Sequence, residues 1–215
     1  MNIRYKTIHN IGKDEIIINK SRFIGYAKPI ENEGEALAFI EEIKSLHKDA
    51  THNVYAYVVG DDNNIQRYSD DGEPSGTAGI PALEVIKKED LRNVVVVVTR
   101  YFGGIKLGTG GLIRAYTKGA KIGLEAGNII EKVLFRKVKI RLDYTLYGKV
   151  ENYLKTNGII TINTIYDDAV NLFVYADYDD YNSFIGIMAD LTNGTVIVDD
   201  IGEEYLSLKN GVKID

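Results

Sequence analysis

The first half of the chain switches between strand-like and helix-like spacing of its hydrophobic residues. Residues 14–30 alternate apolar and polar positions around a break at Asn19–Ser21, which predicts two strands in a hairpin. Residues 33–50 carry apolar side chains three and four positions apart, as in an amphipathic helix. Similar patterns predict strands at 53–60, 65–68 and 93–102, and helices at 81–91 and about 109–126. The strand at 93–102 lacks alternation, so we expect both of its faces to be covered.

The hydrophobic pattern changes from residue 138 onward. Six segments read in turn as strand, helix, strand, strand, helix and strand, the order of a split βαβ unit in which two helices cover one face of an antiparallel sheet. Each predicted helix ends in the same Thr-Asn-Gly sequence, at Thr156–Gly158 and Thr192–Gly194, where glycine allows the left-handed residue that stops a helix. The pattern therefore predicts an α+β chain of two domains, joined near residues 130–137.

Composition restricts the class of protein further. The 215 residues are 45% hydrophobic and 27% charged, as in an ordinary folded protein. There is no cysteine, which excludes disulfides and thiolate-bound metal centres. The first residues lack the apolar stretch of a signal peptide and the run VVVVV at 94–98 is too short to span a bilayer, so we expect a cytoplasmic protein without membrane contact. With a net charge of −5, any site for a polyanion has to be a local patch.

Residues 100–116, RYFGGIKLGTGGLIRAY, carry the richest candidate chemistry. Five glycines stand where a strand turns into a helix, and free amides at the start of a helix attract anions. The segment matches neither the P-loop nor the dinucleotide fingerprint. Two interpretations stay open: a site for phosphate or the RNA backbone, or a tight turn only. The candidate phosphate or RNA contacts are Arg100, Gly103, Gly104, Lys106, Gly108, Thr109, Gly110, Gly111, Arg114 and Lys118.

Two further features flank this segment. Tyr101 and Phe102 adjoin the glycines and are candidates for stacking on a base. Gly119 and Gly123 fall on the apolar face of the predicted helix, where we expect them to let the helix backbone approach the sheet.

The segment SDDGEPSGTAG, residues 69–79, supplies acids. Asp70, Asp71 and Glu73 are candidate Mg²⁺ ligands or bases. The favoured alternative is structural: the acids pair with Arg67, Arg100 or Arg114, while Ser75 and Thr77 cap the next helix. His52 is a candidate acid–base group or RNA-stacking ring, against a capping or interface role. We assign no metal or cofactor.

SDDGEPSGTAGIPAL, RYFGGIKLGTGGLIRAY and ATHNVYAY together resemble the signature of the IMPACT/YigZ family, and residues 138–215 resemble its bacterial C-terminal extension. The resemblance implies a domain at 1–132 folded like domain 2 of ribosomal protein S5, and a ferredoxin-like domain at 138–215. It also implies a pairing similar to the last two domains of elongation factor G. Eukaryotic relatives act in translational control by competing for a partner of an initiation-factor kinase; the bacterial members resemble RNA or ribosome binders without a settled activity.

Three hypotheses about function follow. The preferred one is a non-enzymatic protein that binds RNA, the ribosome or a translation-associated protein through a glycine-rich, basic cleft. The second is an enzyme for a small phosphorylated or nucleotide substrate, with phosphate on the glycines and Mg²⁺ on Asp70, Asp71 and Glu73. The third is a scaffold whose ferredoxin-like domain docks another protein. No motif that reads DNA sequence is present.

Overall fold

The computed structural model describes residues 2–60 and 62–214. It is an α+β protein that divides into two compact units. The first unit comprises the described residues up to Lys132 together with the segment from Ser207 onward, and the second comprises Val133–Leu206. The predicted fold class is therefore confirmed. No helix among the described residues is long and apolar enough to cross a membrane.

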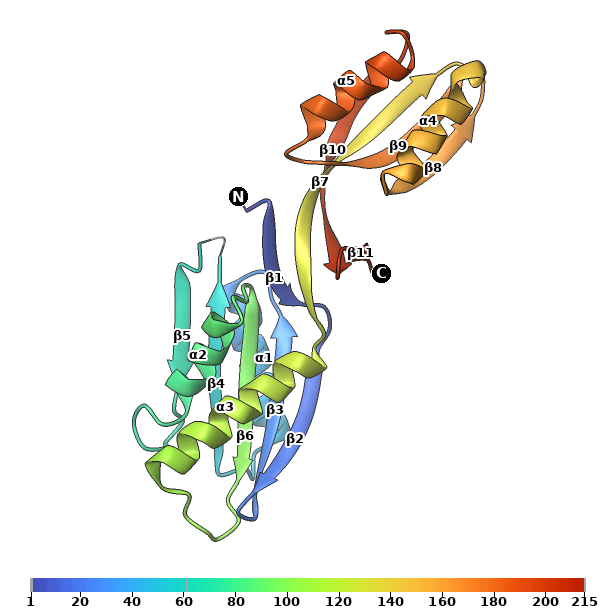
Figure 1. Cartoon of the computed structure of the whole chain (residues 1–215). Coiled ribbons are helices and arrows are strands. Elements are labelled where there is room, and N and C mark those ends of the chain that lie inside the picture. The colour runs from blue at the N-terminus through green and yellow to red at the C-terminus, as the bar shows by residue number, and fades with distance from the viewer. Residues whose placement is uncertain (1, 61, 215) are drawn as a thin grey trace. The chain divides into compact units, whose positions relative to one another are not determined.

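The first unit is built on a five-stranded antiparallel sheet with the strand order β2-β3-β6-β4-β5 (Figure 1). Its strands are β2 (Gly12–Ile18), β3 (Ser21–Pro29), β4 (His52–Val59), β5 (Ile65–Ser69) and β6 (Val94–Tyr101). Its helices are α1 (Glu33–Leu46), α2 (Gly79–Lys88) and α3 (Gly108–Ala126). The hairpin predicted across Asn19–Ser21 is present, with Ile18 paired to Ser21.

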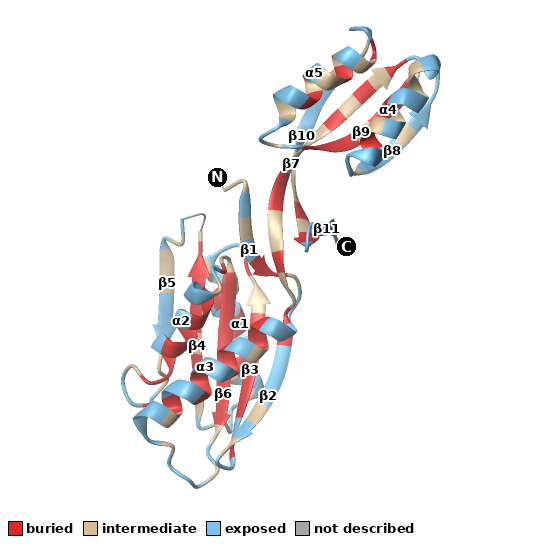
Figure 2. Cartoon of the chain, in the orientation of Figure 1, coloured by how far each residue is buried: buried red, intermediate tan, exposed pale blue. Residues whose placement is uncertain are grey.

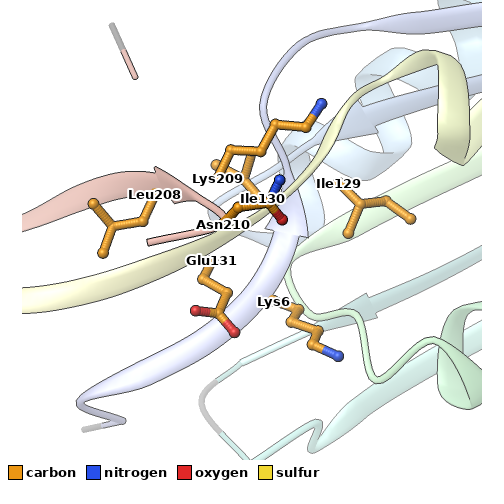
Figure 3. A pocket seen from close by; sticks show the side chains of 7 residues that line it. All are labelled: Lys6, Ile129, Ile130, Glu131, Leu208, Lys209 and Asn210. Carbon is orange, nitrogen blue, oxygen red and sulfur yellow. The ribbon is translucent and has the colours of Figure 1, made fainter. Parts of the chain in front are cut away.

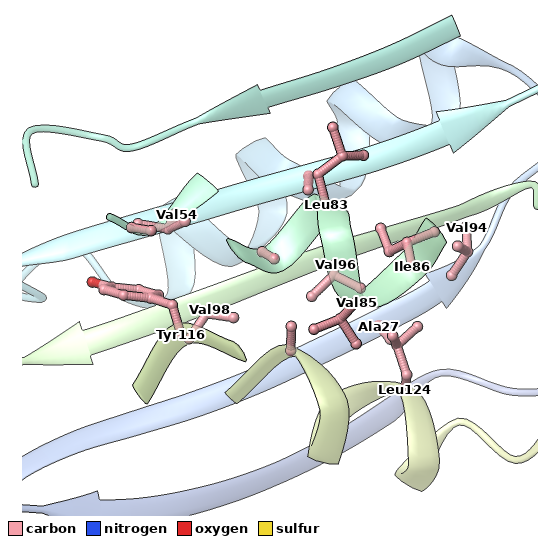
Figure 4. Packing of buried hydrophobic residues seen from close by; sticks show 14 of the residues in the cluster. Ala27, Val54, Leu83, Val85, Ile86, Val94, Val96, Val98, Tyr116 and Leu124 are labelled. Carbon is pink, nitrogen blue, oxygen red and sulfur yellow. The ribbon is translucent and has the colours of Figure 1, made fainter. Parts of the chain in front are cut away.

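Both faces of this sheet are covered, as the run of valines in β6 predicted. Val94, Val96 and Val98 pack in one cluster with α2 and α3 (Figure 4), whereas Val95 and Val97 pack in a second cluster with α1. Successive side chains of a strand point to opposite faces, so β6 contributes to both clusters. Figure 2 shows β6 buried along nearly its whole length. The parity of β6 also determines which face each residue after Val98 points to.

Helix α3 lies unusually close to the sheet, and glycines make this approach possible. A Cβ on Gly119 would come within 2.7 Å of a Val98 methyl group, and one on Gly25 in β3 would come within 2.0 Å of the Gly119 carbonyl oxygen. A Cβ on Gly123 would likewise lie 2.9 Å from the carbonyl carbon of Gly25. The packing role expected of Gly119 and Gly123 is confirmed.

The second unit has the predicted order of strands and helices. Its antiparallel sheet has the order β10-β7-β9-β8, the arrangement of a ferredoxin-like fold. Both helices contribute to one cluster with alternate residues of β7 and β9, so they cover one face of the sheet. The elements are β7 (Ile129–Leu142), α4 (Tyr144–Thr156), β8 (Thr161–Tyr166), β9 (Val170–Asp177), α5 (Tyr181–Leu191) and β10 (Ile197–Lys209). The first residues of β7 and the last residues of β10 belong to the first unit.

Three strand features were not predicted. The chain begins with β1 (Arg4–Ile8), which pairs with β7, and ends with the short β11 (Val212–Lys213), which pairs with β10. In addition, β7 starts at Ile129 and runs through residues 130–137, where the joint between the two domains was predicted. The apolar residues there come in adjacent pairs, Ile129–Ile130 and Val133–Leu134, so they lack the alternation that indicates a half-buried strand.

Candidate functional site

A cleft of about 490 Å³ lies in the first unit where the segment between β5 and α2 meets the segment between β6 and α3. Both connecting segments lie at the same end of the sheet (Figure 1). The two family-like sequence segments, which start at Ser69 and Arg100, therefore meet in space. The cleft is lined by Thr51, His52, Glu73, Pro74, Arg100, Phe102, Lys106, Leu107, Gly108, Thr109 and Leu112.

A buried ion pair forms the floor of the cleft. The Arg100 Nη1 donates to Glu73 Oε1 at 2.6 Å, and the side chains are only 6% and 4% exposed. The same oxygen accepts a hydrogen bond of 2.6 Å from the Tyr116 hydroxyl. Burial, and then this bond to Glu73, raises the pKa of Tyr116 well above its usual value. The tyrosine is therefore a neutral donor that holds the carboxylate in place.

Arg100 reaches this position because of the parity of β6. It shares the face of Val96 and Val98, whereas its neighbours Thr99 and Tyr101 point to the α1 side. Its guanidinium carbon lies 5.4 Å from the Phe23 ring centre and 5.3 Å from that of Phe102. The Arg100 Nε atom is buried and has no hydrogen-bond partner within the described chain. The guanidinium is thus held between two rings with one donor unused.

His52 stands at the edge of this ion pair. Its Nδ1 lies 2.7 Å from the Asp71 carbonyl oxygen, and a carbonyl only accepts, so this nitrogen carries the proton. The Nε2 atom then faces Glu73 Oε1 at 3.8 Å. Asp71 itself has a φ of 46° and accepts a 2.6 Å hydrogen bond from the Asn53 amide. The ring is therefore oriented by the loop, with its second nitrogen toward the cleft.

Asp70 organises the loop that carries Glu73. Its carboxylate accepts hydrogen bonds from the amides of Gly76, Ala78 and Gly79 at 2.8, 3.1 and 2.8 Å. It thereby satisfies one amide of the loop, that of Gly76, and two at the start of α2, those of Ala78 and Gly79. Ser75 and Thr77 were expected to cap this helix, but α2 has no hydrogen bond from the side chain of its N-cap residue.

The three loop acids have three separate sets of partners. Asp70 bonds backbone amides, Asp71 bonds the Asn53 amide, and Glu73 bonds Arg100 and Tyr116. Within residues 2–60 and 62–214, no three acidic or histidine side chains are grouped so as to hold a metal ion. The arrangement of these acids orders the loop and holds the arginine.

The five glycines of residues 100–116, which run from the end of β6 into the first turn of α3, serve different purposes. Gly103 packs against the β2–β3 turn, since a Cβ there would lie 2.1 Å from the Lys20 backbone. Gly104 and Gly108 have φ values of 82° and 68°, which glycine adopts without strain. Gly110 and Gly111 have neither a positive φ nor a backbone contact that excludes a side chain. Only the first three therefore have a clear requirement in the fold.

The amino end of α3 is open and positively polarised. The residue before it, Leu107, provides no side-chain cap, and the first turn contains no acid. The amides of that first turn have no intrahelical partners. A Cβ on Gly110 would lie 3.6 Å from the Arg114 Nη1, which places this guanidinium over the first turn. Lys106 lines the cleft, and Lys118 lies one turn beyond Arg114 on the exposed surface.

Some predicted site residues lie outside the cleft. Tyr101 points to the opposite face, where its hydroxyl bonds His47 Nδ1 at 2.8 Å while Tyr26 bonds Nε2 at 2.7 Å. Burial, aided by Lys13 and Arg22, lowers the pKa of His47. Of the predicted residues, the cleft brings together His52, Glu73, Arg100, Phe102, Lys106, Gly108 and Thr109; it does not include Asp70, Asp71, Tyr101, Gly103, Gly104, Gly110, Gly111, Arg114 or Lys118.

Sequence reasoning missed two contributors to the cleft, Tyr116 and Ser21. Tyr116 ends the segment 100–116 but was not among the candidate site residues. Ser21 was seen only as part of a turn, yet its Oγ accepts from the Gly103 amide at 3.1 Å. Both carry a polar atom at a buried position, which is the signal that could have marked them.

A smaller hollow of about 240 Å³ lies elsewhere in the first unit (Figure 3). Its polar side chains include Glu131, which pairs with Arg4 at 3.7 Å, and Lys209, which bonds Asn128. These contacts are all near the surface, and the hollow contains no buried charged group. It is a weaker candidate than the cleft.

Comparison with known proteins identifies relatives that match most of the chain. The Impact N-terminal domain model matches residues 19–124, and a domain of unknown function, DUF1949, matches residues 140–195. IMPACT family member YvyE of Bacillus subtilis is 47% identical over 190 residues, 88% of each chain. IMPACT family member YigZ of Escherichia coli is 34% identical, over 83% of this chain and 89% of YigZ. A crystal structure of a hypothetical protein aligns with a TM-score of 0.60 and 31% identity, over 94% of this chain and 98% of that one.

Proposed function

Because this chain belongs to the IMPACT family, we propose that it is a non-enzymatic binding protein that engages RNA, free or in the ribosome, through the cleft and the amino end of α3. The observation that carries the proposal is the uncapped first turn of α3 beside exposed cations. Amides there offer hydrogen bonds to phosphate oxygens, and the helix dipole favours negative charge.

Charge around this turn supports a polyanion as the ligand. Lys106, Arg114 and Lys118 are exposed, and none forms an ion pair with another described residue. Arg100 contributes no free charge, because Glu73 neutralises it. The patch is therefore a local excess of positive charge on a chain whose net charge is −5.

An aromatic ring at the cleft supports RNA in a single-stranded form. Phe102 is 46% exposed, and the guanidinium carbon of the buried Arg100 lies over its ring, 5.3 Å from the ring centre. An exposed ring next to groups that can bind phosphate is an arrangement on which unpaired bases stack. Phosphates would bind the α3 amides and Arg114 while a neighbouring base stacks on Phe102.

The test is the salt dependence of binding to a single-stranded RNA oligonucleotide, measured by fluorescence anisotropy. We expect affinity to fall as salt rises, and the triple variant Lys106→Ala, Arg114→Ala, Lys118→Ala to weaken binding and reduce the log–log salt slope by about 2, since each phosphate contact on a single strand contributes roughly 0.7. The matched control is Lys13→Ala, Lys48→Ala, Lys87→Ala, which removes the same charge from exposed positions outside the cleft.

Cosedimentation of the same variants with purified ribosomes extends the test. The proposal expects ribosome binding to weaken in the first triple variant and to persist in the control. Equal binding by both variants, in either assay, would refute the site. Arg100→Ala is unsuitable for this purpose, because it would leave Glu73 buried without its counter-charge.

A further inference from the structure

Strand β8 is an unprotected edge of the sheet in the second unit. It pairs with β9 on one side, and β8 is the terminal strand of the sheet order. Five of its six residues are exposed, including Ile162 at 43%, Ile165 at 45% and Tyr166 at 58%. Edge strands carry backbone donors and acceptors that can pair with another strand.

The other sheet edges in the described chain carry the charges that usually prevent such pairing. On the other side of the same sheet, β10 is covered by β11 only at Leu208 and Lys209, and its remaining part presents Asp199, Asp200, Glu203 and Glu204. In the first unit, β2 presents Lys13, Asp14 and Glu15, and β5 presents Arg67. The sequence of β8, TINTIY, has no charged residue, proline or glycine. Its edge is thus left open where the others are blocked.

The ladder with β9 shows which backbone groups of β8 are free. The Asp167 amide donates to the Ala169 carbonyl, so these two residues form a hydrogen-bonded pair. Hydrogen-bonded and non-hydrogen-bonded pairs alternate along an antiparallel ladder, so Ile165 and Asn163 also bond to β9 through their backbone groups. Thr164 and Tyr166 therefore direct their backbone groups away from β9. In agreement, the Thr164 amide donates to the side chain of its neighbour Asn163, at 2.8 Å.

We propose that β8 pairs antiparallel with β8 of a second copy of this chain, with Thr164 opposite Thr164. A two-fold axis perpendicular to the sheet leaves each side chain on the same face of the sheet. Because successive side chains point to opposite faces, one residue must then lie directly opposite its own copy in the partner strand. Centring the axis on Thr164 brings together the outward-facing groups of both strands. The Thr164 amide then donates to the backbone of the second copy in place of the exposed Asn163 side chain.

Side chains in this register are self-complementary. Ile162 of one copy lies opposite Tyr166 of the other, so two exposed apolar pairs are buried together. Thr164 meets Thr164 at the axis, a favourable cross-strand pair, and no like charges meet. The register shift between Thr161 and Asn163 ends the regular ladder, so the contact is short. We therefore expect a weak dimer that forms with rising concentration.

A single cysteine tests the register directly, because the chain has none of its own. In the proposed dimer Thr164→Cys puts two cysteines directly opposite each other, about 5.5 Å apart at Cα and within disulfide reach. Asn163→Cys is the matched control: its two copies lie diagonal to each other, about 7–8 Å apart and beyond easy reach. Under mild oxidation we expect a disulfide-linked species of doubled mass for Thr164→Cys and little for Asn163→Cys.

Sedimentation velocity over a concentration series tests the pairing without a cross-link. Asn163→Lys with Ile165→Lys places like charges opposite each other in the dimer and should abolish the doubling of mass seen at high concentration. Ile197→Lys with Ile201→Lys adds the same charge at exposed positions of β10 and should leave it intact. Residues 133–206 hold twelve acidic and six basic side chains, so added salt should strengthen this dimer while it weakens RNA binding.

The proposal is independent of the RNA site. A chain that stays monomeric at every concentration overturns it, as does cross-linking that is equally fast for Thr164→Cys and Asn163→Cys. A dimer that survives Asn163→Lys with Ile165→Lys also overturns it, because that dimer would use another surface.

Discussion

At the scale of single residues, the central feature is the buried pair of Glu73 and Arg100. Removing one member leaves the other charge without compensation at a position where both side chains are more than nine-tenths buried. We expect Glu73→Ala to lower the free energy of unfolding of the first unit by about 3–5 kcal/mol, measured by urea unfolding. The cost reflects the stranded guanidinium between Phe23 and Phe102 rather than the intrinsic strength of the pair.

Tyr116→Phe is the comparison for this prediction. It removes one hydrogen bond to the same carboxylate oxygen but leaves the ion pair in place, so its cost should be about 1.5–3 kcal/mol. If Glu73→Ala costs no more than Tyr116→Phe, then Arg100 is able to reach water, and the pair is not the closed contact described above.

The sequence indicated which residues take part in the cleft better than it indicated what they do. The two glycine-rich segments that meet there were both identified. The burial of Arg100 was not identified. Whether an arginine near the end of a strand is buried depends on where that strand ends and on which face of the sheet the residue points to. The pairing of a loop acid with Arg100 was an expectation from the sequence. The second donor to the same Glu73 oxygen, the Tyr116 hydroxyl, was not expected.

At the scale of elements, α3 combines two kinds of glycine. Gly119 faces Val98 with no space for a methyl group, while Gly110 on the exposed first turn has ordinary space around it. We expect Gly119→Ala to destabilise the first unit by about 1–3 kcal/mol through overpacking. Gly110→Ala should instead stabilise it by up to about 1 kcal/mol, since alanine loses less backbone entropy in a helix. Thermal unfolding followed by circular dichroism measures both.

Stabilisation by both substitutions would contradict the close approach of α3 to β3 and β6. Gly110→Ala also bears on the binding site: it leaves the first-turn amides in place, so RNA affinity should change little. A large loss of affinity in this variant would mean that the ligand backbone approaches Gly110 closely.

Most elements could be predicted from hydrophobic spacing, because β2, β3, α1, β6 and α3 each have a clear period or a fully buried run. The exceptions have a common physical reason. Strand β1 and the first part of β7 lack a regular alternation of apolar and polar residues, and their strand geometry depends on pairing with each other. Pairing between segments more than a hundred residues apart is not visible in a local pattern.

At the scale of the whole molecule, the chain contains separate hydrophobic cores. The clusters of the first unit and that of the second share no residue. We therefore expect two transitions in differential scanning calorimetry. Phe39→Ala, in the α1 cluster, and Leu172→Ala, in the second unit, each remove a fully buried side chain at a cost of about 2–5 kcal/mol.

Each substitution should lower one transition and leave the other in place, because destabilisation from a cavity is confined to the core that loses the contacts. Destabilising the second unit should not affect the cleft, which lies in the first unit. We therefore expect Leu172→Ala to leave RNA affinity unchanged at temperatures below both transitions. A single transition that both variants shift equally would contradict separate cores and would mean that β7 and β10, which run through both units, bind them into one cooperative structure.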